Sequence, residues 1–186
     1  DDADGSPQLA LPPAAHVFYT LCKVRGYKTI VKFVSHEARD LEPLVRLLAA
    51  YPPDHPEWHV AYALMVWLSM VVMVPFDLSI IDSALPAGAT PSAAGEPAPL
   101  VRSIEELGRA QLSCAGPSRD AAAVLLARLL TRPGLQHQLR GFIVWGAARL
   151  GEARAEGGVD GRTTFLTAGI YAALAAVFKL GHREEL

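Results

Sequence analysis

Residues 60–74 read VAYALMVWLSMVVMV, and this stretch decides the fold class. Only Tyr62 and Ser69 interrupt its apolar side chains. It is shorter than the ~20 residues that a helix needs to cross a bilayer, and the residues at 75–77 close it without a basic flank. The stretch therefore predicts a helix that is buried on all sides at the centre of a helical protein.

Helix boundaries recur on both sides of this stretch. Apolar residues at helical spacing predict further helices at 12–25, 27–34, 41–50, 100–114, 118–131, 135–150 and 161–180. Asp40, Ser118 and Asp160 stand where side chains commonly cap a helix, and no alternating strand pattern competes. Seven or eight helices of uneven length, joined by short proline or glycine breaks, are too many for a simple bundle. They predict an all-α fold, an α-solenoid of HEAT- or armadillo-like antiparallel helix pairs.

The organisation along the chain follows from the same punctuation. We expect residues 1–186 to be a single helical-repeat segment of a longer solenoid, because both ends lack the signs of a domain boundary. Residues 1–11 are expected to form a flexible start. Residues 84–99 are expected to form a flexible loop, because they are rich in proline, alanine and glycine.

Composition and cysteine content indicate the general class of the protein. The chain has 186 residues, of which 51% are hydrophobic and 19% charged, so it can fill a sizeable core. A formal net charge of −2 gives no reason to expect a nucleic-acid or anionic-membrane partner. Cys22 and Cys114, far apart in the sequence, favour buried thiols in a reducing compartment, so a cytoplasmic location is expected.

No motif for catalysis or cofactor binding stands out. The sequence contains no GxxxxGK[ST], GxGxxG or GxSxG, so a nucleotide cradle and a nucleophile elbow are unsupported. His55 and His59 have the spacing of two zinc ligands on a helix. Pro56 lies between them and no third ligand is near, so a helix start with a solvated histidine is favoured. We expect no enzyme activity, no cofactor and no metal.

Basic residues gather in one place. Lys23, Arg25, Lys28 and Lys32, with Arg39 further on, lie on and around the short helix at 27–34. A solvated helix face is the plainer explanation, and a site for an acidic protein partner is the alternative. We name the first four as candidate partner-binding residues.

Two other sets of residues also have both a structural and a functional interpretation. Arg119, Arg128 and Arg132 are candidates for a second basic stripe. Trp58, Trp67 and Trp145 are interpreted as core residues rather than binding anchors.

Several short sequence motifs resemble the N-terminal region of the tubulin-specific chaperone D family, also called tubulin-folding cofactor D. They are KVRGYKT (23–29), HE (36–37), DLEP (40–43), WLS (67–69), VPFDLS (74–79), RDAAAVL (119–125) with Arg128, TRP (131–133), AALA (172–175), VFK (177–179) and RE (183–184). These motifs occur in the same order as in the family, across most of the chain. Residues 84–99 have no counterpart, and 157–164 match loosely.

The resemblance implies a non-catalytic chaperone scaffold of HEAT-type repeats in microtubule biogenesis. Such a protein binds β-tubulin, joins tubulin-folding cofactors C and E and an Arf-like small GTPase, and helps assemble or dissociate the α/β-tubulin heterodimer. It implies GTPase activation only as part of that complex, and a place in the cytoplasm with the microtubule cytoskeleton. Tubulin is strongly acidic, which fits Lys23, Arg25, Lys28 and Lys32 as contacts.

Two alternatives stay open from the residues alone. One is a generic helical-repeat adaptor with unrelated cargo, which composition by itself favours. The other is a small helical enzyme or metal protein, which bound zinc or iron would support.

Overall fold

A computed structural model describes residues 7–84, 97–155 and 160–181. Within these residues the secondary structure consists of α-helices and short 3-10 helices, without a strand. The helices are α1 (Pro7–Arg25), α2 (Tyr27–Ile30), α3 (Leu41–Ala49), α4 (Trp58–Val71), α5 (Pro99–Gln111), α6 (Pro117–Leu130), α7 (Gln136–Ala155) and α8 (Gly161–Leu180), with 3-10 helices η1 (Val31–Phe33), η2 (Ala38–Asp40) and η3 (Leu78–Ile81). The all-α prediction is confirmed.

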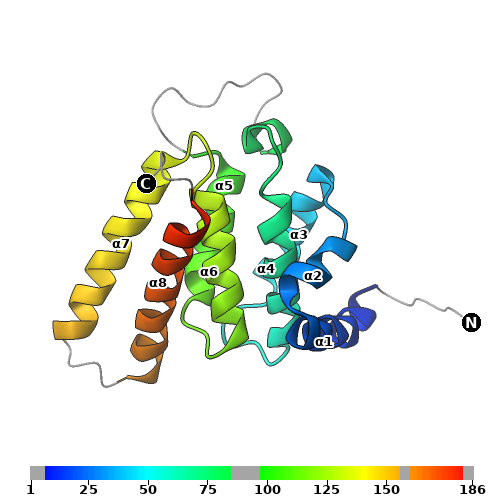
Figure 1. Cartoon of the computed structure of the whole chain (residues 1–186), viewed down its shortest axis with the longest axis horizontal. Helices are drawn as coiled ribbons and strands as arrows, with labels where there is room; N and C mark the ends of the chain where they lie inside the picture. The colour runs from blue at the N-terminus through cyan, green and yellow to red at the C-terminus, as the bar shows by residue number, and fades with distance from the viewer. Residues whose placement is uncertain (1–6, 85–96, 156–159, 182–186) are drawn as a thin grey trace, which may run out of the picture.

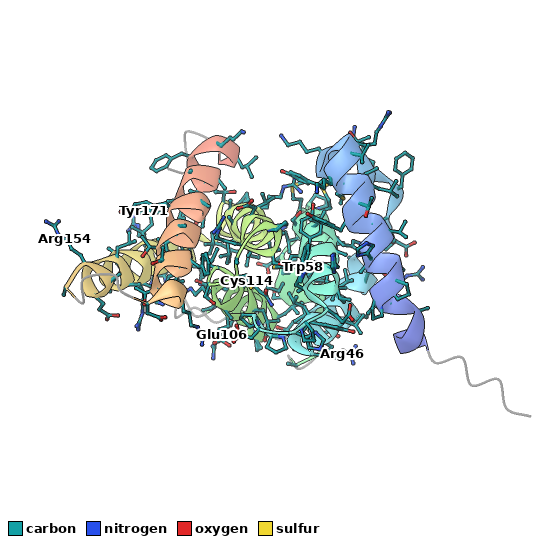
Figure 2. All side chains as sticks on the ribbon, turned by 90° about the horizontal axis from the view of Figure 1, so that it is seen from below. Arg46, Trp58, Glu106, Cys114, Arg154 and Tyr171 are labelled. Carbon is teal, nitrogen blue, oxygen red and sulfur yellow. The ribbon has the colours of Figure 1, made fainter. Side chains whose placement is uncertain are left out.

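The helices stack in two layers (Figures 1 and 2). Helices α4, α6 and α8 lie side by side in one layer, while α3 and α5 pack behind α4 and α6 in the other. Helix α1 covers the free edge of α4, and α7 packs along α8 at the opposite end of the array. Successive helices thus form the pairs α3/α4, α5/α6 and α7/α8, as expected for a helical-repeat array.

The core runs along α4 and α6. Helix α4 is buried nearly all round because its neighbours contact it from several sides, and Val60, Met65 and Leu68 have no measurable exposure. Helix α6 contributes small and apolar side chains, among them Ala122, Leu125 and Leu129. The buried central helix predicted for residues 60–74 is therefore present.

Several predicted boundaries were wrong. Helix α1 begins at Pro7, so residues 7–11 are helical, and Pro12 and Pro13 lie inside the helix near its start. Residues 1–6 lie outside the described part of the chain, as do residues 85–96 of the predicted loop. Helix α4 ends at Val71, four residues before Pro75.

The predicted side-chain caps are absent. Asp40 and Asp160 occupy N-cap positions but make no side-chain cap hydrogen bond. Gly116, with a φ of 82°, occupies the N-cap of α6 because the chain turns there in a conformation that glycine adopts easily. Ser118 lies within α6, and its hydroxyl donates to the carbonyl of Trp58 at 3.3 Å.

A cap that sequence reasoning missed comes from a distant carboxylate. Asp82 is only 7% exposed, and its Oδ2 accepts the backbone N–H of Leu100 in the first turn of α5 at 2.7 Å. Its Oδ1 accepts the N–H of Ala84 at 3.0 Å. Asp82 therefore stabilises the start of α5 from the far side of the 85–96 segment.

Helix α8 is long and apolar enough, by length and composition alone, to cross a membrane. It packs along α6 and α7, and it exposes Tyr171 and Phe178 by 60% and 74%. Residues 60–71, by contrast, belong to the buried core helix α4.

Candidate partner-binding surfaces

The four candidate basic residues share one corner of the molecule. Lys23 and Arg25 lie in the last turn of α1, Lys28 lies on α2, and Lys32 lies on η1. All four side chains are exposed. Within the described segments, no ion pair joins any of them to a carboxylate. We call these four residues the basic corner.

A glycine turn builds the basic corner. Gly26 has a φ of 82°, and its N–H donates to the carbonyl of Cys22 at 2.8 Å, which ends α1. Its own carbonyl then accepts the N–H of Thr29 at 3.0 Å and so begins α2. The turn at Gly26 joins two helices that contact each other, so basic residues from both helices lie around the same turn.

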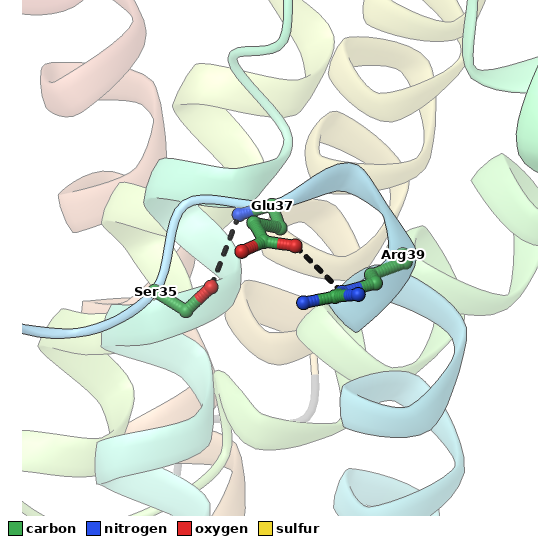
Figure 3. A network of polar contacts seen from close by, with 3 residues as sticks. All are labelled: Ser35, Glu37 and Arg39. Atoms are coloured by element: carbon green, nitrogen blue, oxygen red, sulfur yellow. Dashed lines mark hydrogen bonds and ion pairs between the residues drawn. The ribbon is translucent and has the colours of Figure 1, made fainter.

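Arg39 does not join the basic corner as a free charge. Its Nε lies 2.6 Å from Oε2 of Glu37 (Figure 3). The backbone N–H of Glu37 in turn donates to the Ser35 hydroxyl at 3.3 Å. The pair is exposed, so it adds little to stability. It does offset the positive charge of Arg39.

The predicted second basic stripe is wrong, because two of its arginines point inward. Arg128 donates through Nη1 to the carbonyl and hydroxyl oxygens of Ser69, each at 3.0 Å. Arg132 donates to the carbonyl of Val72, to that of Val74 at 2.9 Å and to that of Phe76 at 2.6 Å. Both guanidinium groups are half-buried, and burial lowers the pKa of each.

The carbonyl groups at the end of α4 explain why Arg128 and Arg132 point inward. The last carbonyls of a helix have no donors within the helix, and that end carries a partial negative charge. Arg128 on α6 supplies a hydrogen bond and positive charge to the last turn of α4. Arg132, on the loop after α6, does the same for the segment that follows α4. These contacts bring together two of the motifs that carry the family resemblance, at 74–79 and 131–133. The two motifs line a cleft of about 560 Å³.

The histidine pair is not arranged as a metal site. The His55 ring accepts the N–H of Glu57 at Nδ1, at 3.0 Å. The His59 ring instead stacks on Trp58 with centroids 3.7 Å apart and meets the edge of His16 at 4.5 Å. Burial lowers the pKa of His59, and the neighbouring His16 lowers it further. In the described part of the chain no group of three or more His, Cys, Asp or Glu side chains could hold a metal ion.

The tryptophans lie at the margin of the core. Trp58, Trp67 and Trp145 are half-buried and pack against it, as the core interpretation requires. Trp67 is also anchored by a polar contact, because its Nε1–H donates to the Ser35 carbonyl at 2.6 Å. Trp145 lies beneath the guanidinium of Arg109, 4.8 Å from the ring centroid.

Sequence reasoning missed a row of exposed apolar side chains on α1. Val17, Leu21 and Val24 are 58%, 45% and 74% exposed and end beside the basic corner. Their spacing of four and three residues was readable from the sequence. The buried partners Ala15 and Cys22 on the other side of α1 hid the signal, because both sides of the helix are apolar.

Comparisons with known proteins agree with the resemblance. A family model described as tubulin-specific chaperone D-like, ARM repeat, matches residues 2–150. Tubulin-specific chaperone D of Dictyostelium discoideum is 26% identical over 250 residues, covering 96% of this chain and 17% of that protein. Tubulin-folding cofactor D of Schizosaccharomyces pombe is 26% identical over 127 residues, covering 68% of this chain and 10% of that protein.

The chain thus spans less than a fifth of the length of these curated relatives. No solved structure matches it. The match to an ARM-repeat model agrees with the paired helices described above and confirms the helical-repeat solenoid as the fold class. The chain belongs to the tubulin-specific chaperone D-like family.

Proposed function

We propose that this chain is part of a tubulin-folding cofactor, a non-catalytic scaffold that binds β-tubulin. In this proposal the full-length protein works with cofactors C and E and an Arf-like small GTPase to assemble or dissociate the α/β-tubulin heterodimer. GTP hydrolysis is carried out by the partners, the scaffold activates it only within the complex, and the assembly acts in the cytoplasm at the microtubule cytoskeleton. Family membership and the names of the relatives support a tubulin-related role.

The observation that carries the proposal to particular residues is the basic corner. Lys23, Arg25, Lys28 and Lys32 are exposed, close in sequence and unpaired with carboxylates in the described segments. Exposed charge that no neighbour neutralises raises the rate at which an oppositely charged partner is captured. Tubulin is acidic, so the basic corner is proposed as a contact for it or, failing that, for the small GTPase.

The test reverses two charges in the full-length protein. Lys28→Glu with Lys32→Glu is expected to leave the helical fold intact, because both side chains are exposed. The affinity for tubulin should fall by about tenfold. Lys179→Glu with Arg140→Glu is the matched control, because it reverses two exposed charges on α8 and α7.

Two outcomes would contradict the proposal. If affinities for tubulin and for the small GTPase are both unchanged in the Lys28/Lys32 variant, the basic corner is only a solvated face. If the wild-type protein binds neither and retains an unrelated protein from cytosol, the generic adaptor is the better description.

A further inference from the structure

Helix α1 has two apolar sides. One side faces the core, where Ala15 and Cys22 are 3% and 4% exposed and the helix packs against α4. The other side carries Ala14, Val17, Leu21 and Val24, all of which are exposed. We call these four residues the α1 row. Helix α1 lies at the edge of the molecule, so the described part of the chain leaves this row uncovered (Figure 2).

The spacing of the α1 row is that of a helix–helix seam. Its members follow one another at intervals of three, four and three residues, which keeps them on one side of a helix. From Ala14 to Val24 the row extends about 15 Å, at about 1.5 Å per residue. By contrast, α3 exposes no large apolar side chain, so it has only one apolar side. A second row at this spacing on a surface helix is typical of a helix with two packing partners.

The charge around the row selects the kind of partner. No aspartate or glutamate occurs between Pro7 and His36, while Lys23, Arg25, Lys28 and Lys32 lie within this range. The basic corner therefore lies directly at the C-terminal end of the α1 row, where Val24 stands between Lys23 and Arg25. A helix that packs on the row would meet positive charge without a compensating carboxylate on α1 or α2.

We propose that the α1 row is the docking site for an amphipathic helix of an acidic protein partner. The apolar side of that helix packs on Val17, Leu21 and Val24, and its carboxylates meet the basic corner. Because the surface joins apolar area to unpaired charge, binding weakens with salt but persists in part at high salt. This inference rests on the proposed function, for which tubulin is the acidic partner and therefore the probe.

The experiment uses the full-length protein with a reporter cysteine in the row. Val24→Cys should react quickly with a maleimide, because Val24 is 74% exposed, and tubulin should slow that reaction by at least about tenfold. Val144→Cys on α7 is the matched control, because Val144 is 69% exposed and should react equally with and without tubulin. Peptide mass spectrometry separates these sites from other cysteines.

A second pair of variants measures affinity. Leu21→Ser with Val24→Ser should raise the Kd for tubulin by about tenfold or more, because the complex loses apolar contact area. Ile143→Ser with Val144→Ser matches it closely, because Leu21 and Ile143 are both 45% exposed. The control pair should change the Kd by less than about twofold.

Several results would overturn the inference. Slow labelling of Val24→Cys in the free protein would show that the protein's own chain covers the row. Unprotected Val24→Cys in a complex with bound tubulin would place tubulin elsewhere and leave the proposed function standing. Protection by phosphatidylserine vesicles but not by tubulin would identify a membrane surface as the occupant. Wild-type protein that does not bind tubulin at all would instead overturn the proposed function, and this inference with it.

Discussion

Replacing Arg132 with alanine should show how much the contact between the loop after α6 and the segment after α4 contributes to stability. The Arg132 guanidinium on the loop after α6 binds three carbonyls that follow α4, at Val72, Val74 and Phe76. Hydrogen bonds that involve a charged group contribute about 1.5 to 3 kcal/mol each, and the three are not additive because they share one side chain. Arg132 is only half-buried, so water can replace part of the loss.

We expect Arg132→Ala to lower the free energy of unfolding by about 3 kcal/mol. Denaturant unfolding followed by both far-UV circular dichroism and tryptophan fluorescence measures this change. Arg140→Ala is the control, because Arg140 is an exposed arginine on α7 and its loss should cost no more than about 0.5 kcal/mol. A loss for Arg132→Ala no larger than that of the control would refute the structural role that we assign to this arginine.

Four further predictions can be checked by the same unfolding measurement. Trp67→Phe should cost about 1 kcal/mol, because it keeps most of the ring packing but loses the bond to the Ser35 carbonyl; no change would show that this bond is not formed in solution. Asp82→Ala should lower the free energy of unfolding by about 1 to 2 kcal/mol, because it removes the acceptor for the N–H of Leu100. Asp82→Asn should lower it less, since the amide oxygen can still accept this hydrogen bond, and equal losses for the two variants would exclude the capping of α5 by Asp82. Replacing residues 85–96 with a short Gly/Ser linker should change stability by no more than about 1 kcal/mol, and a loss of several would show that this segment packs on the body. The folded state holds the pKa of His59 below its ordinary 6.5, so the unfolded chain binds a proton at a higher pH than the folded protein does. The free energy of unfolding should therefore fall as the pH drops below that value. His59→Gln should flatten this pH dependence, and an unchanged slope would exclude His59 as its source.

The fold was largely predictable because it depends on local patterns. Residues 60–74 are apolar on every side, and a helix of that kind can only be buried. The positions of the helices followed from apolar spacing and from glycine and proline. The capping residues were less predictable, because whether Asp40 or Asp160 turns toward its helix depends on side-chain rotation that sequence spacing does not encode.

The candidate site was predictable only in part, for a different physical reason. The basic corner is formed by residues that are close in sequence, so their clustering along the chain pointed to it. Arg128 and Arg132 could not be assigned in this way, because their carbonyl partners lie 56 to 60 residues away in the chain. In the sequence they look like surface charge, and only the packing of α6 on α4 brings them to carbonyls in and after the last turn of α4.

The most direct test of the account is the salt dependence of tubulin binding by the full-length protein. The Kd should be measured from about 0.05 M to about 0.5 M salt, for the wild type and for Lys28→Glu with Lys32→Glu. We predict that the wild-type Kd rises with salt, and that the variant starts with a higher Kd and rises less steeply. Equal Kd values and equal salt slopes for the two proteins would contradict the claim that this corner of the solenoid binds tubulin.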